Sequence, residues 1–289
     1  MAIQLALLGW LLASTVAAAE IRVVGSDLLG ESFTRAVAGF ARQNDAVIKL
    51  ELRGTRPDLV ELAAGHGELG LFLLPAGETP PGEPLVSRVI GYQVAVVMVP
   101  AASPLRQVTV AQLRGMFALA AGETFSRWGE LNLIGEWTSR PIALRALAPA
   151  AGLAFPLFQH AMLADGEPKA TVQFSATPEA LARRLLAAEN TIGVTGMTVP
   201  EVTGLRVLAL AASPSDPAYA PTVENVHNGS YPLRMPLYVV FPRPAAPDLQ
   251  LFLKFLLSDE AAAALAPAHF VPLPVGVRNR LVFELEEMR

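Results

Sequence analysis

The chain has 289 residues, of which 52% are hydrophobic and 17% are charged. This composition is too apolar for a disordered chain, and the length suits one large domain or two lobes of about 100–150 residues each. The formal net charge is −4, from 22 Lys and Arg against 26 Asp and Glu, so no basic surface for nucleic acid is expected. The absence of cysteine excludes disulfides, cysteine zinc sites and thiol nucleophiles.

Residues 1–19 have the pattern of a signal peptide. An apolar run from Ile3 to Ala13 is followed by small residues at Ala17 and Ala19, which fit cleavage after Ala19. No Lys or Arg precedes the run, which departs from the usual pattern. The alternative is an uncleaved membrane anchor, but the run is shorter than the roughly 20 residues that cross a bilayer. We therefore expect export to a bacterial periplasm.

The segment after the signal peptide alternates between strand and helix patterns. Apolar or alternating runs predict strands, and apolar residues at helical spacing predict helices between them. In chain order these are a strand at Ile21–Val24, a helix at Glu31–Gln43, a strand at Val47–Arg53, a helix from Leu59 to Gly65 and a strand at Leu69–Leu74. This β-α-β-α-β order predicts a parallel sheet with right-handed crossovers.

The rest of the chain begins with a long apolar strand at Ile90–Val99 and ends with helices. Thr109 and Gln112 match a capping box for a helix that runs to about Phe117, and Thr177 caps another helix. Further strands are predicted at Ile142–Leu144, Thr191–Thr195, Leu205–Leu210 and Leu237–Phe241, and further helices at Gly152–Leu163, Leu249–Leu257, Asp259–Leu265 and Val275–Arg289.

Two βα-rich halves, with one apolar strand passing into the second half and another returning late, predict an α/β fold of two lobes joined by two crossover strands. Such folds bind ligands in the cleft, at the carboxyl ends of strands and the N-termini of helices. The free backbone N–H groups at those helix ends are natural sites for anions.

Several short motifs occur in an order that resembles one family. Val24-Gly25-Ser26-Asp27 is similar to its opening strand and loop, and Thr109–Phe117 is similar to its "T-x-x-Q-L-x-x-I-F" helix. The most specific match runs from Pro221-Thr222-Val223-Glu224-Asn225 to Pro236-Leu237-Tyr238, and Phe270-Val271-Pro272-Leu273 resembles the closing "F-V-P-L". The chain thus resembles the phosphate-binding component of phosphate ABC transporters, over essentially all of its mature length.

The resemblance implies a periplasmic binding protein of type II, which closes on a small-molecule ligand and docks on an ABC permease. Residues 20–97 together with 231–289 would form lobe 1, and residues 98–230 would form lobe 2. The family binds phosphate, so the implied ligand is phosphate or another oxyanion. We expect a monomer.

The pocket residues depart from the family pattern. The opening loop usually reads "G-S-D-T", but Leu28 stands at the Thr position. The third strand ends in the apolar run Leu71-Phe72-Leu73-Leu74, where the family has polar residues. The "S-G-T-R" helix start of lobe 2 falls on Gly152-Leu153-Ala154-Phe155, so its Ser, Thr and Arg are absent. We therefore expect weak or altered anion binding in a cavity that Leu28, Leu73 and Phe155 share.

The candidate ligand-binding residues come from three loops, and each has an alternative role. They are Ser26, Asp27, Arg53, Thr55, Arg56, Gly152 and Leu153. Ser26 and Asp27 follow a strand, where such residues also serve as helix caps. The two arginines can supply replacement charge for an oxyanion, or they can be solvated surface residues. The helix start near Gly152 offers backbone N–H groups, although its apolar side chains also fit an empty, collapsed cleft.

No pattern of catalytic residues, metal ligands or cofactor binding appears. The segment His66-Gly67-Glu68 resembles part of a zinc-deaminase motif, but the chain has no cysteine to complete it. Neither a G-x-S-x-G elbow nor a phosphate-binding GxxxxGK[ST] loop occurs. We expect a solute-binding protein with no catalytic residue, no metal and no cofactor. The alternative is a binding-protein scaffold reused as a sensor, accessory or interaction protein, and a hydrolase is the remote third.

Overall fold

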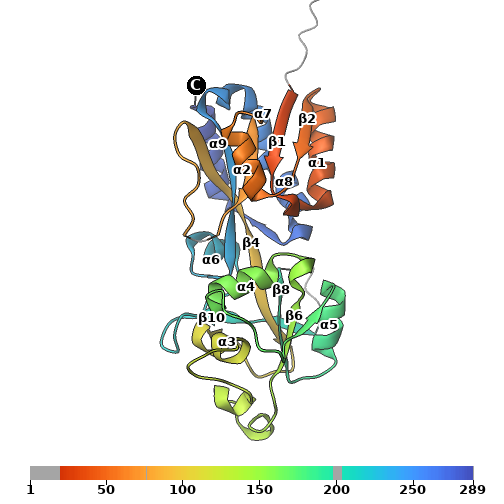
Figure 1. The fold of residues 1–289 in the computed structure, drawn as a ribbon, viewed down its shortest axis with the longest axis vertical. Helices are drawn as coiled ribbons and strands as arrows, with labels where there is room; N and C mark the ends of the chain where they lie inside the picture. Colours follow the sequence, from red (N-terminus) through yellow and green to blue (C-terminus); the bar gives the residue numbers. More distant parts are fainter. Residues whose placement is uncertain (1–19, 76, 198–203, 289) are drawn as a thin grey trace, which may run out of the picture.

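The protein consists of two lobes placed end to end along its long axis (Figure 1). The computed structural model describes residues 20–75, 77–197 and 204–288, so the predicted signal peptide lies outside the described residues. One lobe contains the first strands and the C-terminal helices, and the other is built from the middle of the chain. Within the described residues, no helix is long and apolar enough to cross a membrane.

The first lobe is built on a parallel sheet whose central strand is β1 (Glu20–Gly25). It pairs in parallel with β2 (Val47–Glu51) and with β3 (Leu69–Leu73), through α1 (Gly30–Gln43) and α2 (Thr55–Ala63). The predicted β-α-β-α-β unit is confirmed. Helix α2 begins four residues earlier than predicted, because its first turn carries no apolar residue from which periodicity can be seen.

The two lobes are joined by a pair of antiparallel strands, as the sequence predicted. β4 (Leu85–Pro100) pairs with β11 (Arg234–Pro242) along its first half and with the second lobe along its last residues. It is five residues longer at its start than the predicted strand. Residues 85–89 are mostly half-exposed and residues 90–100 are buried throughout, so only the buried part has a continuous apolar signature. β4 runs from one lobe into the other without a break, so the strand itself does not mark where one lobe ends. The predicted residue boundaries of the two lobes therefore remain a proposal.

The second lobe has a smaller sheet in which β8 pairs with β4 and, in parallel, with β6. The strands of this sheet, besides β4, are β6 (Ala143–Leu147), β7 (Gln173–Ser175), β8 (Thr191–Gly196) and β9 (Leu205–Val207). A separate pair of strands is formed by β5 (Gln107–Thr109) and β10 (Ala209–Ala211). The helices are α3 (Val110–Phe117), α4 (Ala154–Leu163) and α5 (Pro178–Leu186). The predicted strand Leu205–Leu210 is split at Leu208, because its two parts pair with different strands, β4 and β5.

The predicted capping box of α3 is present. The Thr109 hydroxyl accepts the Gln112 N–H at 3.1 Å, and the Gln112 side-chain oxygen accepts the Thr109 N–H at 2.9 Å. The pair satisfies two backbone donors at a helix start, which is why this short helix begins at Val110.

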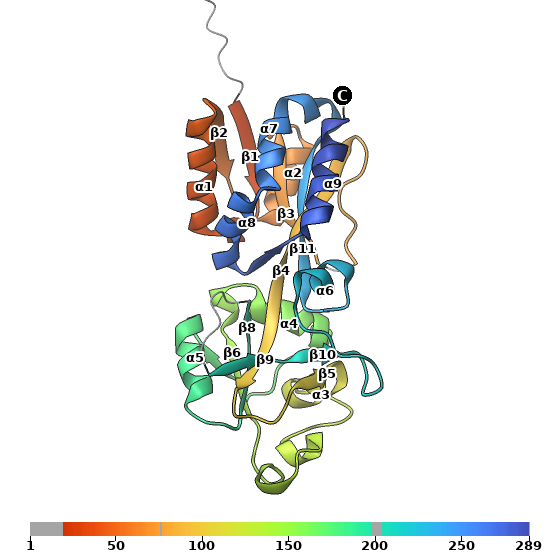
Figure 2. The same cartoon turned by 180° about the vertical axis from the view of Figure 1, so that it is seen from behind.

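The C-terminal part of the chain returns to the first lobe and covers its sheet. Helix α8 packs beside α1, and α9 beside α7 (Figure 2). The elements are α6 (Val223–Asn228), α7 (Ala246–Leu256), α8 (Asp259–Leu265), β12 (Phe270–Pro272) and α9 (Val275–Glu286). The 3-10 helices of the described residues are η1 (Asp27–Leu29), η2 (Trp128–Leu131), η3 (Gly135–Trp137), η4 (Pro149–Ala151), η5 (Arg243–Ala245) and η6 (Ala266–Ala268).

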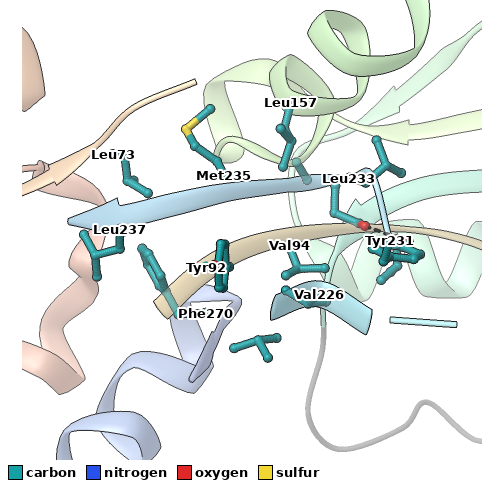
Figure 3. Packing of buried hydrophobic residues seen from close by; sticks show 14 of the residues in the cluster. Leu73, Tyr92, Val94, Leu157, Val226, Tyr231, Leu233, Met235, Leu237 and Phe270 are labelled. Carbon is teal, nitrogen blue, oxygen red and sulfur yellow. Dashed lines mark hydrogen bonds between the residues drawn. The ribbon is translucent and has the colours of Figure 1, made fainter. Parts of the chain in front are cut away.

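Apolar side chains pack around the two crossing strands at the junction of the lobes (Figure 3). Tyr231 is fully buried there, and its hydroxyl donates a hydrogen bond to the Ala95 carbonyl at 3.0 Å. Burial raises the pKa of Tyr231, because the ionised phenolate would lose its hydration. The contact ties the returning chain to β4 just before β11 begins.

Candidate ligand-binding site

A cavity of about 370 Å³ opens between the lobes beside the crossing strands. The loops after β1 and β2 and the end of β3 form its wall in the first lobe, and Leu153, just before α4, lines it from the second lobe. Its lining residues are Ser26, Asp27, Leu28, Gly54, Thr55, Arg56, Pro57, Leu73, Pro75, Leu153 and Met235. The carboxyl ends of three parallel strands therefore meet at this site, where α/β folds place their ligands.

Most of this lining is apolar. Leu28 and Leu73 share the cavity, as the sequence predicted, and Leu153 and Met235 add to it. The prediction for Phe155 was wrong: its side chain is 1% exposed and its ring lies edge-to-face on Phe174 at 4.9 Å. Helical spacing places Phe155 on the buried face of α4, and the residue before the helix faces the cavity instead.

Ser26 and Asp27 occupy the loop after β1 but have different environments. Ser26 is 2% exposed, and its hydroxyl accepts the Leu28 N–H at 3.3 Å, which makes it the cap of η1. The alternative role considered for Ser26 is thus present in the structure. Asp27 is exposed at the cavity, and its carboxylate has no hydrogen bond or ion pair to any part of the chain that the structure describes.

A buried carboxylate, Asp58, holds the first two loops together. It accepts the Gly25 N–H at 2.7 Å, the Arg53 N–H at 3.0 Å and the Arg53 Nε–H at 2.9 Å. Its side chain is fully buried, whereas that of Arg53 is 49% exposed. Sequence reasoning missed this residue. Its position in the first turn of α2 is the available signal, since an acid there complements the positive end of the helix.

The close contact of the first loop with β3 requires glycine at position 25. A Cβ atom on Gly25 would lie 2.1 Å from the Leu71 carbonyl oxygen, and its φ of 147° is one that other residues rarely adopt. The Ser26 N–H also donates to this carbonyl at 2.8 Å. The loop therefore lies directly against β3, which brings Leu28 to the same cavity as Leu73.

The two predicted arginines are both paired with acids. The Arg53 guanidinium contacts Asp58 and lies 3.6 Å from Glu61, and Arg53 does not line the cavity. Arg56 lines the cavity with a side chain that is 72% exposed, and it is bonded to Glu78. An anion in the cavity would have to compete with these carboxylates for either guanidinium.

Thr55 is the one predicted residue whose hydroxyl both lines the cavity and bonds a neighbouring strand. Its Oγ1 accepts the Leu73 N–H at 3.1 Å, so its own O–H remains available to donate. Thr55 also begins α2, after Gly54 with a φ of 119°.

A second cavity of about 410 Å³ adjoins the first and shares Asp27 and Leu28 with it. Gly152 lines this second cavity, whereas Leu153 lines the first, so the two predicted residues of the second lobe face different compartments. The second cavity lies between the start of α1 and the segment from α8 to β12. Its other lining residues are Leu29, Gly30, Glu31, Ser32, Arg35, Gln93, Ala151, Ala264, Pro267, Ala268 and His269.

Two known proteins are similar to the chain in sequence. The "Phosphate-binding protein PstS" of Pseudomonas aeruginosa is 24% identical over 283 residues, which cover 91% of this chain and 85% of that protein. The "Protein SphX" of Synechococcus elongatus is 26% identical over 189 residues, covering 64% of this chain and 55% of that protein.

Solved structures share the fold. A possible phosphate-binding protein from Planctomyces limnophilus superposes with a TM-score of 0.69 over 94% of this chain and 99% of that one, at 18% identity. An ABC-type phosphate transport receptor from Vibrio cholerae superposes with a TM-score of 0.66 over 88% of this chain and 100% of that one, at 14% identity. Residues 13–260 match the family model of the PBP superfamily domain. The chain therefore belongs to the PBP superfamily domain family, and it has the two-lobed fold of phosphate-binding relatives.

Proposed function

We propose that the chain is an exported solute-binding protein that feeds an ABC permease and whose cleft binds phosphate weakly or binds another solute. The family membership, and the likeness to a protein named as phosphate-binding, support the role in solute binding. The proposal includes cleavage of residues 1–19, a monomeric state and the absence of catalytic turnover.

The apolar lining of the cleft is the main support for weak binding of phosphate. Leu28, Leu73 and Leu153 line the cavity at or beside positions where the family resemblance places polar groups. Each hydrogen bond to a charged group contributes roughly 1.5–3 kcal/mol. The loss of about four of them removes on the order of 6 kcal/mol, which corresponds to about four decades in affinity.

The neighbouring charges favour the same conclusion. Arg56, the cationic side chain that lines this cavity among the described residues, is paired with Glu78. The unpaired carboxylate of Asp27 lies at the same cavity and repels an anion. A phosphate ion would meet the Thr55 hydroxyl and backbone N–H groups, but no free guanidinium among these residues.

Calorimetry with phosphate tests this proposal. We expect the purified protein to bind phosphate no more tightly than the millimolar range, and micromolar or tighter binding would show that the pocket is still an anion site. Leu28→Thr restores a hydroxyl at the family position, and Leu28→Val is its control of equal shape without the hydroxyl. Phosphate should bind about tenfold more tightly to the Thr variant than to the Val variant, since one charged hydrogen bond is gained.

The apolar lining also favours a second candidate, a scaffold that acts as a sensor or accessory protein without transport. This candidate predicts that the lobes stay in one arrangement when solutes are added. Small-angle scattering with and without solute separates the two, because a transport-type binding protein closes and becomes more compact on binding.

A further inference from the structure

Asp27 lines the cleft with a carboxylate that has no hydrogen bond or ion pair within the described residues. We propose that its ligand is an organic cation, with an ammonium group at Asp27 and an apolar body against Leu28, Leu73 and Leu153. This inference rests on the proposed function, since it names the class of solute for the same cleft.

Asp27 lies where the two cavities meet, because it lines both. Its carboxylate faces the second loop: a Cβ atom built on Gly54 would lie 3.9 Å from Asp27 Oδ1. The other charged residues around the two cavities have partners. Glu31 pairs with Arg35 at 3.5 Å, and Arg56 pairs with Glu78. Across the described residues, Asp27 is thus the one charged side chain of the cleft with no ion pair.

Gln93 also lines the second cavity, and its side chain is 5% exposed. Its Nε2 donates to the Ala268 carbonyl at 3.4 Å. Its Oε1 is buried and has no hydrogen-bond partner among the described residues.

His269 lines the same cavity, and its Nδ1 lies 2.7 Å from the Met197 carbonyl oxygen. A carbonyl oxygen only accepts hydrogen bonds, so Nδ1 donates to it.

The first cavity provides the apolar wall. Leu28, Leu73, Leu153 and Met235 line it together with Asp27. A volume of about 370 Å³ lies within the range that holds small organic molecules. An amine with a short hydrocarbon chain can thus place its nitrogen at the carboxylate and bury its chain, whereas a small inorganic anion matches neither part.

Calorimetry with four compounds tests the inference on the purified chain. Hexylammonium, hexanol and hexanoate share one hydrocarbon chain and differ only in the head group, and phosphate has no chain. We expect hexylammonium to bind most tightly, at least tenfold better than hexanol. Asp27→Asn should weaken hexylammonium by about 10- to 100-fold and leave hexanol unchanged. Leu153→Ala should weaken both compounds alike, because it removes only apolar wall.

Asp45→Asn is the matched control. Asp45 is exposed at the end of α1 with a φ of 49°, a conformation that Asn also tolerates, and it lines neither cavity. This variant should bind hexylammonium as the wild type does. Tighter binding of hexanoate, or an Asp27→Asn variant with unchanged affinity for hexylammonium, would overturn the inference and leave the proposed solute-binding role intact. If no compound of any class bound or changed the scattering of the lobes, the proposed function would fail as well.

Discussion

The buried carboxylate of Asp58 should be the most sensitive point of the loops that line the cleft. In Asp58→Ala, the buried Gly25 N–H loses its charged acceptor, 2.7 Å away, which costs about 1.5–3 kcal/mol. The Arg53 guanidinium loses its partner as well, but its side chain is 49% exposed and can be rehydrated, so this part costs only about 1 kcal/mol. The sum is about 2.5–4 kcal/mol of unfolding free energy.

Equilibrium urea unfolding, followed by far-ultraviolet circular dichroism, measures this loss. Asp58→Asn should lose about half as much, because the amide keeps one acceptor for the Gly25 N–H. Asp216→Ala is the control: Asp216 is exposed in a loop, and its removal should change the unfolding free energy by less than about 0.5 kcal/mol. If Asp58→Ala lost no more than this control, the buried carboxylate would not be what holds the two loops, and our reasoning would be wrong.

Three further predictions concern the junction of the lobes, a helix start and acid stability. Tyr231→Phe leaves a buried carbonyl without its donor and should cost about 1–2 kcal/mol in urea unfolding, and no change would refute the role of this hydrogen bond. Thr109→Ala removes the cap of α3 and should cost about 1 kcal/mol, whereas Thr109→Ser should cost much less. Hydrogen bonds from Lys49 and then Arg22 lower the pKa of Glu51 to about 2, against an ordinary 4.5. The stabilisation by this carboxylate is therefore present above pH 4.5 and is lost as the pH falls towards 2. Melting temperatures should fall less steeply across this range in Glu51→Gln than in the wild type.

Much of the fold could be predicted, because each strand and helix carries a local signal. Alternation and helical spacing located the strands and helices of the first lobe, and the cap at Thr109 located the start of α3 to the residue. The failures are local as well. The start of α2 was missed because its first turn is polar, and the division of Leu205–Leu210 was missed because it depends on which distant strand each half meets.

The apolar character of the cleft could be predicted from Leu28 and Leu73, since Leu28 follows β1 and Leu73 ends β3 at the same edge of a parallel sheet. The orientation of single side chains was not. Phe155 and Leu153 are both apolar and two residues apart, and only the packing of α4 on the second lobe decides that Leu153 faces the cavity. The ion pairs could not be predicted from the sequence either, because Arg56 and its partner Glu78 are 22 positions apart.

The amino-acid sequence alone determined the element order, the two-lobed class and the loss of polar groups from the loops, because these depend on periodicity and on residue type at the ends of strands. Only the tertiary structure decided which charges remain unpaired in the cleft. Asp27 and Asp58 are both acids near strand or helix ends, yet one is exposed between two cavities and the other is sealed under a loop with Arg53. That difference arises from contacts between distant segments, which no local pattern records.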